Sequence, residues 1–282
     1  MQKAPPTGGK AYKGGSPMFT TIGFIGCGNM GSAMARAFRL ACPTAELFFA
    51  NRSPEKAEDL AQSLVGQVCS NAEAAKCSLV ALGVKPQLMG DVLADLRPVL
   101  AARGDRFVLL TMAAGLTTAR IRELAGADYP VARIMPNTPA AIGAGVIQLC
   151  HDGLTEVELE ELTELLSGAG LVDLIDEELI DAACAVSGCG PAFAYMFLDA
   201  LARGGEACGL PRDKALLYAA KMLEGAAKLA GQSDESPEAL KQAVCSPGGA
   251  TIQGVYALEN ANFSAAVQSA VQASYKRALE LK

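Results

Sequence analysis

The sequence has few of the residues that metal sites and disulfide frameworks require. It contains a single histidine, His151, and its nine cysteines include no C-x-x-C pair, so neither a histidine-based nor a zinc-type metal site is expected. Positive charge is in deficit, with 24 lysines and arginines against 30 aspartates and glutamates. The net charge of −6 argues against a general nucleic-acid-binding surface. No apolar run is expected to reach the length of a membrane span, and none near the start resembles a secretory signal.

Apolar residues, in contrast, make up 51% of the 282 residues. This is enough core for one large domain or two ordinary ones. An odd number of cysteines without paired spacing fits free thiols in a reducing cytosol, so a cytoplasmic protein is expected. Residues 1–17 are rich in Lys, Pro and Gly and lack hydrophobic periodicity. They are predicted to be a disordered extension or a tag remnant, with Met18 as a candidate natural start.

The first informative motif is a glycine-rich turn between a predicted strand and a predicted helix. The strand covers Thr21 to Ile25, and Gly26-Cys27-Gly28-Asn29-Met30-Gly31 follows it directly. In a G-x-G-x-x-G motif the first glycine allows the tight turn and the second lets the backbone approach a pyrophosphate. The third lets the helix pack against the strand. The context therefore predicts dinucleotide binding, and the alternative is a purely structural glycine turn.

The end of the next predicted strand indicates which dinucleotide is bound. This strand, Leu47 to Ala50, runs into Asn51-Arg52-Ser53-Pro54, where an NAD enzyme usually has Asp or Glu for the ribose hydroxyls. Arg52 can pair with a 2′-phosphate, and Ser53 is expected to cap the next helix. NADPH is therefore the predicted cofactor, with NADH possible. The alternative is that Arg52 is a solvated surface charge.

Predicted strands and helices then alternate through the first half of the chain. The further strands are expected at 78–84, 107–111, 131–135, 142–149 and 171–175. This predicts a Rossmann-type parallel sheet covered by helices on both faces. Ligands of such sheets bind beyond the carboxyl ends of the strands, where Lys85, Ala113 and Asn137 lie. These three are candidates for the nicotinamide side, although Lys85 could equally be a solvated loop lysine. Asn71 is predicted to cap a helix.

After residue 175 only helices are predicted, at about 176–185, 192–202, 212–229, 238–244, 250–258 and 263–281. The segment from Ala192 to Ala202 is apolar nearly all round, so it must be buried on several sides. An all-α domain of about 100 residues has few fully buried helices. We therefore expect this helix to pack against a second copy of the chain.

The stretch Ser246-Pro247-Gly248-Gly249-Ala250-Thr251 precedes one of these helices. Pro247 stiffens the entry, and the glycines permit close backbone approach. Gly249 and Ala250 are expected to present free N–H groups at a helix start, which suits a carboxylate or a phosphate. The alternative is an ordinary Pro-Gly turn before a helix.

Four local patterns together resemble those of pyrroline-5-carboxylate reductases. They are GCGNMG at 26–31, VKP at 84–86, SGCGPA at 187–192 and VCSPGGAT at 244–251. The patterns follow the family's order across nearly the whole chain from Phe19, and the last is the most specific. Cys189 stands where serine is common in the family, and Gly83 where alanine is common.

The resemblance implies a Rossmann domain over residues 18–178 and a helical dimerisation and substrate domain over 179–282. It further implies interlocked dimers, an active site shared between two subunits, and larger rings in some members. The implied activity is the reduction of 1-pyrroline-5-carboxylate to L-proline by NADPH or NADH, the last step of proline biosynthesis.

Together with the strand-end argument, the resemblance assigns roles to individual residues. The predicted cofactor-binding residues are Gly26, Gly28, Asn29, Met30, Gly31, Asn51, Arg52, Ser53, Asn71, Val84, Lys85, Pro86, Met112, Ala113, Ala114 and Asn137. The predicted substrate-binding residues are Ser187, Gly188, Gly190, Ser246, Gly248, Gly249, Ala250 and Thr251. Thr251 is also the predicted catalytic residue, because its hydroxyl can hydrogen-bond the imine nitrogen while the substrate carboxylate sits on the Gly249 and Ala250 N–H groups.

Two other functions remain open from the sequence. A β-hydroxyacid dehydrogenase has a similar domain plan but needs a general acid or base, usually a lysine of the helical domain. Lys214, Lys221 and Lys228 are present there, although none lies in a recognisable motif. A non-catalytic NADP-sensing or scaffold protein would bind the dinucleotide without needing the anion site at residues 249–251.

Overall fold

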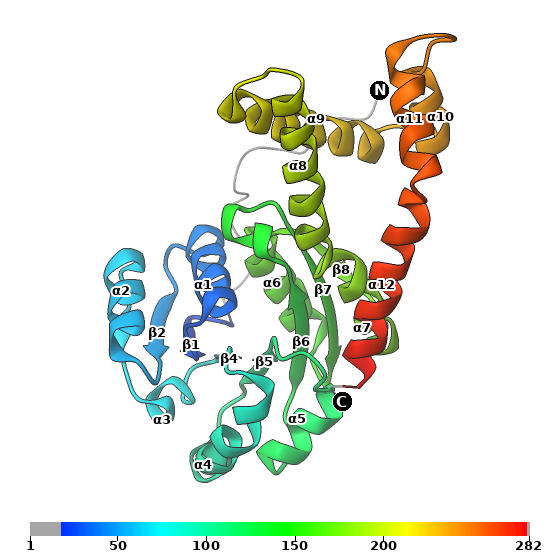
Figure 1. Ribbon diagram of the computed structural model, residues 1–282. Coiled ribbons are helices and arrows are strands. Elements are labelled where there is room, and N and C mark those ends of the chain that lie inside the picture. Colours follow the sequence, from blue (N-terminus) through cyan, green and yellow to red (C-terminus); the bar gives the residue numbers. More distant parts are fainter. Residues whose placement is uncertain (1–17, 281–282) are drawn as a thin grey trace. The chain divides into compact units, whose positions relative to one another are not determined.

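Figure 1 shows the computed structural model, which describes residues 18–280. The chain divides into two compact units, one ending at Gly188 and including the residues from Arg277 onwards, the other running from Cys189 to Lys276. The first unit extends beyond the predicted boundary at residue 178, because helix α7 (Ile180–Ser187) packs against strand β7 (Gly145–Asp152). The predicted extension at residues 1–17 lies outside the described residues.

The first unit is built on one eight-stranded sheet with the strand order β3-β2-β1-β4-β5-β6-β7-β8. The strands are β1 (Thr21–Ile25), β2 (Glu46–Ala50), β3 (Gln67–Val68), β4 (Leu79–Leu82), β5 (Val108–Thr111), β6 (Val131–Pro136), β7 (Gly145–Asp152) and β8 (Gly170–Leu174). The order reverses between β1 and β4, so the carboxyl end of β1 lies at the crevice where such sheets bind ligands.

Every strand pair in this sheet is parallel except β6 with β7, which is antiparallel, with Ile134 opposite Leu149. The connection between the two strands holds only the short 3₁₀ helix η2 (Thr138–Ile142). A parallel return needs a crossover of about a dozen residues or more, so this short link permits only an antiparallel neighbour. The predicted Rossmann-type sheet is confirmed, with this one antiparallel pair added.

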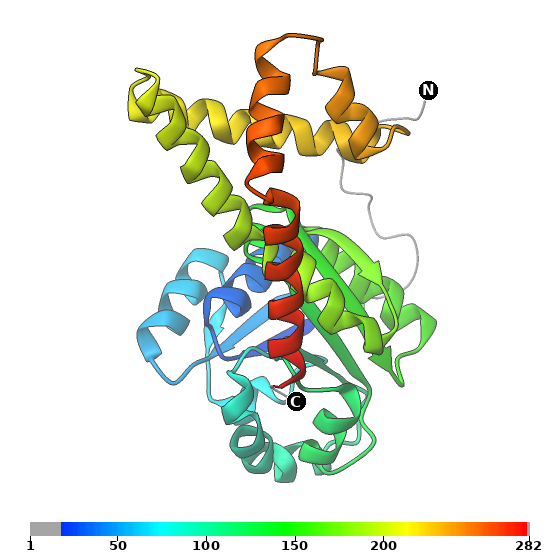
Figure 2. The ribbon, with the colours of Figure 1, turned by 45° about the vertical axis from the view of Figure 1, so that its right-hand side comes forward.

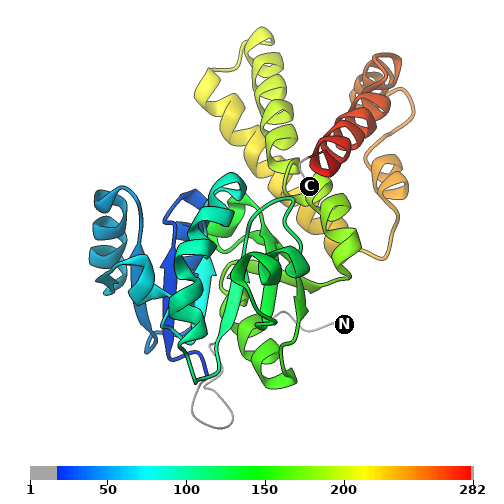
Figure 3. The ribbon, with the colours of Figure 1, turned by 90° about the horizontal axis from the view of Figure 1, so that it is seen from below.

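Helices cover both faces of the sheet (Figures 1 and 3). Consecutive residues of β1 point to opposite faces of the sheet, so neighbouring side chains are buried in different cores. Phe24 packs with Phe38 and Phe49 in one core, and Ile25 packs with Leu93 in the other. The helices of the first core are α1 (Asn29–Ala41), α2 (Pro54–Leu64) and α6 (Glu156–Ser167). Those of the second are α3 (Asn71–Ala74), α4 (Met89–Ala101) and α5 (Thr118–Ala125).

The helix cap predicted at Asn71 is displaced by one residue. Ser70 is the cap, because its hydroxyl accepts from the Glu73 N–H at 3.2 Å while the Glu73 carboxylate accepts from the Ser70 N–H at 2.8 Å. Asn71 is the first residue of α3 and is exposed. The reciprocal Ser–Glu pairing satisfies two otherwise unpaired N–H groups, which a single Asn cap would not do.

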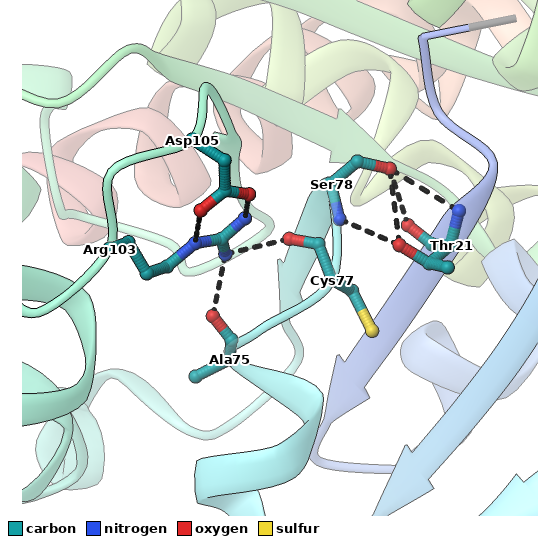
Figure 4. Close-up of polar contacts among 6 residues, drawn as sticks. All are labelled: Thr21, Ala75, Cys77, Ser78, Arg103 and Asp105. Carbon is teal, nitrogen blue, oxygen red and sulfur yellow. Dashed lines mark hydrogen bonds and ion pairs between the residues drawn. The ribbon is translucent and has the colours of Figure 1, made fainter.

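The amino ends of the strands are held by a separate polar cluster, drawn in Figure 4. The Ser78 N–H donates to Thr21 Oγ1 at 2.9 Å, and the Ser78 hydroxyl donates to the Thr21 carbonyl at 2.8 Å. Arg103 donates to the carbonyl oxygens of Ala75 and Cys77 at 2.7 and 2.8 Å. These bonds join the starts of β1 and β4, so they stabilise the edge of the sheet opposite the ligand-binding crevice.

The second unit consists of helices whose apolar side chains are mostly exposed. Its helices are α8 (Gly190–Ala207), α9 (Arg212–Gln232), α10 (Pro237–Ala243), α11 (Ala250–Asn260) and α12 (Phe263–Leu279), of which the last residues belong to the first unit. Helices α8 and α9 pack on each other (Figure 2). Among the described residues of α8 to α12, only Ala202, Ala215 and Ala219 are buried. A unit of this kind has not buried its own hydrophobic surface.

Among the described residues, one segment, Glu177–Ala207, is by length and composition apolar enough to cross a membrane, and its 18-residue window has a mean hydropathy of 1.3. The expectation that no apolar run reaches this length is therefore wrong. Part of the segment is held in the first unit, because Asp181 pairs with the buried Arg133 at 3.2 Å. The remainder forms α8, whose exposed Tyr195 and Met196 favour contact with another protein surface.

Candidate active site

The glycine-rich turn lies at the carboxyl end of β1 and allows no side chain at two of its three glycines. Gly26 has φ +98°, and a methyl group there would lie 2.7 Å from backbone atoms of Gly83 and Val84. A methyl group at Gly31 would lie 2.4 Å from the Gly26 carbonyl oxygen. At Gly28, in contrast, a methyl group would meet no atom of the described chain within 4 Å. Gly26 and Gly31 are therefore packed against backbone, whereas the space next to Gly28 is not filled by the described chain.

The glycine-rich turn leads directly into helix α1. Gly28 is the cap of this helix and supplies no side-chain hydrogen bond, and the first turn of α1 has no acidic residue. The N–H groups of Asn29, Met30 and Gly31 have no intrahelical acceptor, because they come first in the helix. A helix start with free donors and no competing carboxylate is suited to a phosphate.

Three polar residues, Asn51, Arg52 and Ser53, follow β2 directly, and only Asn51 makes side-chain hydrogen bonds that shape the turn. Asn51 accepts from the Cys27 N–H through Oδ1 and donates to the Ser53 carbonyl through Nδ2, both at 2.9 Å. Arg52 and Ser53 are exposed. Ser53 occupies the predicted cap position of α2, but its hydroxyl makes no capping hydrogen bond to this helix. The expected capping bond is therefore not formed, and the hydroxyl remains available.

The ends of β4 and β5 carry the other predicted nicotinamide residues. Lys85 is exposed, and Pro86 opens the 3₁₀ helix η1 (Pro86–Leu88) behind it. Val84 and Met112 are half-buried, and Ala114 is exposed. Ala113 is buried, and its N–H lies 3.3 Å from the Thr111 hydroxyl that accepts from it. These residues line one edge of the sheet, as the strand-end argument predicts, but their contacts with a cofactor remain a prediction.

Asn137, predicted at the nicotinamide side, uses both ends of its amide inside the first unit. Its Nδ2 donates to the Ser187 carbonyl, and its Oδ1 accepts from the Val146 N–H, both at 3.0 Å. With 7% of its surface exposed, Asn137 has little capacity left for a ligand. Its geometry fits a residue that holds the end of α7 in place.

Gln148 on β7 is a second residue that holds Ser187, and the sequence reasoning missed it. Its Nε2 donates to the Ser187 hydroxyl at 2.9 Å, and it is 3% exposed. The Ser187 hydroxyl also lies 3.0 Å from the Ala183 carbonyl. A polar residue inside the apolar run Val146 to Cys150 was the available signal, because buried amides in strands need a partner.

In the second unit the Pro-Gly-Gly stretch forms a tight turn at the start of α11. Gly248 has φ +72°, which favours glycine. A methyl group at Gly249 would lie 2.3 Å from the Ser246 hydroxyl. The Gly249 N–H donates to the Ser246 carbonyl at 3.0 Å. The prediction that this N–H is free is therefore wrong. The donors left at the helix start are those of Ala250, Thr251 and the next residue.

The described residues offer no alternative chemistry in these segments. They contain no cluster of three or more His, Cys, Asp or Glu side chains that could hold a metal ion. Burial is the main cause that raises the pKa of the Cys27 thiol to about 11, with Cys69 contributing. Cys27 is therefore protonated at neutral pH and is no nucleophile. The candidate features are therefore the glycine-rich turn at the start of α1 in one unit and the start of α11 in the other.

Comparison with known proteins tests this reading. The family model described as pyrroline-5-carboxylate reductase dimerisation matches residues 177–281, and that described as NADP oxidoreductase coenzyme F420-dependent matches residues 21–115. Pyrroline-5-carboxylate reductase of Pisum sativum is 37% identical over 93% of this chain and 96% of its own. Pyrroline-5-carboxylate reductase 2 of Homo sapiens is 37% identical over 93% of this chain and 84% of its own.

Solved structures agree over most of the chain. The Plasmodium falciparum pyrroline carboxylate reductase with NADP bound matches with a TM-score of 0.84 and 28% identity, over 94% of this chain and 99% of its own. The Streptococcus pyogenes 1-pyrroline-5-carboxylate reductase matches with a TM-score of 0.83 and 32% identity, over 92% and 98%.

The Rossmann-type sheet with its phosphate-binding turn, followed by an all-helical unit, defines a two-domain oxidoreductase that uses a nicotinamide dinucleotide. Within that class, the chain belongs to the pyrroline-5-carboxylate reductase family. The resemblance stated from the four motifs is thereby confirmed, as are the fold class and the enzyme class.

Proposed function

We propose that the protein reduces 1-pyrroline-5-carboxylate to L-proline with NADPH, the last step of proline biosynthesis. The observation that carries the proposal is the turn at residues 246–251, where a methyl group on Gly249 would lie 2.3 Å from the Ser246 hydroxyl and where helix α11 begins without a side-chain cap. This turn belongs to a chain that also carries the Gly26–Gly31 phosphate-binding turn. A small acid and a dinucleotide are the two ligands that these features suit.

The cofactor is proposed to be NADPH, with NADH as a weaker alternative. Bound NADP in the Plasmodium falciparum relative supports this choice. In this chain no carboxylate lies among residues 51–54, directly after β2. Arg52 is exposed and the Ser53 hydroxyl makes no capping hydrogen bond, so both are available for a 2′-phosphate. Free donors of α1 would hold the pyrophosphate. Val84, Lys85, Pro86 and Met112 to Ala114 would flank the nicotinamide.

The substrate is a five-membered cyclic imine with one carboxylate. We propose that the carboxylate binds the N–H groups of Ala250 and Thr251, because the Gly249 N–H is engaged by Ser246. The exposed Thr251 hydroxyl would then hydrogen-bond the imine nitrogen. Ser187, Gly188 and Gly190, at the end of α7 and the start of α8, would lie near the substrate.

The chain's contribution to the reaction is mainly positioning. NADPH, when bound, supplies the hydride that adds to the C=N carbon. Protonation of the imine nitrogen makes that carbon electrophilic, so the reaction needs no histidine and no carboxylate pair. Thr251 holds the protonated nitrogen in a fixed orientation, and the helix start holds the other end of the ring. Orientation and exclusion of water then supply the rate enhancement.

The working form is proposed to be an interlocked homodimer in the cytoplasm. The family model matched by residues 177–281 is described as a dimerisation domain. A groove of about 790 Å³ between α8 and α11–α12 is lined by apolar side chains, including Phe193, Phe197 and Phe263. A second copy is the natural occupant of so large an apolar surface. No disulfide joins any of the nine cysteines, which supports a reducing compartment.

A β-hydroxyacid dehydrogenase is less well supported. Its candidate lysines, Lys214, Lys221 and Lys228, are all exposed on α9, and Lys221 pairs with Glu224 at 2.7 Å. The deciding assay offers the purified protein the cyclic imine or a panel of 3-hydroxy acids, with NADPH oxidation or NADP reduction as the readout. The proposal expects proline to form from the imine and expects no turnover of the 3-hydroxy acids. Turnover of hydroxy acids alone favours the dehydrogenase, and no turnover favours a scaffold.

A further inference from the structure

We infer that Asn51 is a positioning residue that fixes the glycine-rich turn in its cofactor-binding shape before any cofactor binds. This inference rests on the proposed use of a dinucleotide. It revises the expectation that the Asn51 side chain faces the 2′ position. In this account Asn51 serves NADPH and NADH equally, and discrimination between them falls to Arg52 and Ser53.

The geometry shows that the Asn51 amide joins two loops that the sequence separates. Its Oδ1 accepts from the Cys27 N–H at 2.9 Å, and its Nδ2 donates to the Ser53 carbonyl at 2.9 Å. The acceptor and one donor of the amide are therefore engaged inside the protein. The first bond connects the turn after β1 to the end of β2, and the second shapes the turn that leads into α2.

The bond to Cys27 lies at the centre of the glycine-rich turn. The N–H of the preceding residue, Gly26, donates to the Ala50 carbonyl at 2.8 Å. Two consecutive N–H groups of the turn are thus bonded to the end of β2. Cys27 is 2% exposed, so without Asn51 its N–H would be left buried without an acceptor, which is unfavourable.

The order of this turn determines where the phosphate donors point. Gly28 follows Cys27 directly and caps α1, whose first N–H groups are the proposed pyrophosphate donors. If the Cys27 peptide rotates, the start of α1 loses its fixed orientation. Binding then has to order the turn, which lowers affinity for any dinucleotide. Because the pyrophosphate is common to NADPH and NADH, the loss is the same for both.

Arg52, unlike Asn51, does not contribute to the shape of the turn. It is exposed, and it makes no hydrogen bond or ion pair with any residue that the structure describes. Its removal therefore leaves the turn intact and removes only a charge that a 2′-phosphate can use. Asn51 and Arg52 are adjacent in sequence, yet their substitution is expected to give different patterns of cofactor affinity.

The experiment compares Asn51→Ala, Asn51→Asp and Arg52→Ala in the full-length protein. Dissociation constants for NADPH and NADH are measured by calorimetry, and exchange of the Cys27 amide proton is measured by NMR without cofactor. Asn51→Ala should weaken both cofactors by a similar factor, about tenfold, and should speed Cys27 exchange. Arg52→Ala should weaken NADPH alone by about tenfold or more and leave Cys27 exchange unchanged.

Asn51→Asp keeps an oxygen acceptor for Cys27 but loses the donor to the Ser53 carbonyl and adds a negative charge next to Arg52 in the sequence. It should retain slow Cys27 exchange and weaken NADPH more than NADH, and it keeps the test informative if Asn51→Ala does not fold. A loss of NADPH affinity alone in Asn51→Ala, with unchanged Cys27 exchange, would overturn the inference. If the native protein binds neither cofactor, the proposed function fails, whereas fast Cys27 exchange in the native protein refutes the Asn51 contact itself.

Discussion

The Gln148 side-chain amide of β7 donates to the Ser187 hydroxyl at the end of α7, with 2.9 Å between Nε2 and Oγ. The two residues are distant in sequence, and the contact is almost fully buried on the Gln148 side. Ser187 opens the Ser-Gly-Cys-Gly-Pro pattern that the family resemblance assigns to the substrate. The position of that pattern is therefore set from within the sheet.

This contact predicts coupled effects of Gln148→Ala and Ser187→Ala. Gln148→Ala should lower the free energy of unfolding by about 1–3 kcal/mol, because the Ser187 hydroxyl loses a buried partner. It should also raise KM for the imine more than it lowers kcat. In the double variant the two losses should not add, with a coupling of about 0.5–3 kcal/mol. Gln67→Ala, on the exposed strand β3, is the control, and fully additive losses would show that the contact is not functional.

A second prediction concerns assembly. Met196 on α8 lines the apolar groove of the second unit and is 73% exposed in the single chain, so an aspartate there should be tolerated by the monomer but not by an apolar interface. Met196→Asp should convert the native dimer or larger assembly to monomer in sedimentation velocity and reduce activity with it. Leu40→Asp on α1, where the native leucine is 74% exposed, should leave assembly unchanged. A native protein that sediments as a monomer contradicts the proposed dimer.

A third prediction follows from a buried carboxylate far from the proposed site. Burial alone would raise the pKa of Glu158, but hydrogen bonds from Arg106 and Thr155 lower it below the ordinary 4.5. Arg106 approaches both Glu158 oxygens, at 2.7 and 2.8 Å. Because the folded pKa is lowered, this stabilisation is present above the unfolded pKa and is lost as the pH falls through the folded pKa.

Glu158→Gln should therefore lower the free energy of unfolding at pH 7 by about 1–3 kcal/mol. The difference from the native protein should shrink as the pH falls below 4.5 and through the lowered folded pKa, where the native carboxyl becomes protonated. Urea unfolding at several pH values measures both quantities. Glu160→Gln on the same helix changes an exposed carboxylate and should have little effect at any pH. A loss that does not shrink at any acid pH at which the native protein is still folded would rule out the charged pair as the cause.

A fourth prediction tests the proposed role of Thr251. Thr251→Ala should lower kcat/KM for the imine by about one to two powers of ten, equivalent to about 1–3 kcal/mol. Thr251→Ser keeps the hydroxyl and should recover most of the activity. Because the residue is exposed in the single chain, neither change should alter the melting temperature of the chain much. Unchanged kinetics in Thr251→Ala would remove Thr251 from the mechanism.

Much of this structure was predictable because its sequence patterns are local. The strand at Thr21–Ile25 and the helices of the second unit follow from hydrophobic periodicity, and the structure confirms them. Strand β3 was missed because two exposed residues carry no periodic signal. His151 lies next to Asp152-Gly153, a pair typical of turns, yet it is half-buried in β7, because pairing with β6 extends that strand beyond its apolar residues.

The polar contacts of the candidate site were less predictable, because they depend on residues distant in sequence. Asn51, Asn137 and Gln148 each use their side-chain amides in hydrogen bonds to residues that are distant in sequence. Residue type alone marks an asparagine at a strand end as a candidate ligand, as was done for Asn51 and Asn137. Only the folded geometry shows that their hydrogen-bonding groups are already engaged.

The most direct test of the central claim follows the hydride itself. NADPH deuterated at C4 of the nicotinamide is incubated with the native protein and 1-pyrroline-5-carboxylate, and the product is analysed by mass spectrometry and NMR. The account predicts L-proline carrying one deuterium on the carbon that was doubly bonded to nitrogen. Proline without that deuterium, or no proline while NADPH binds normally, would contradict it.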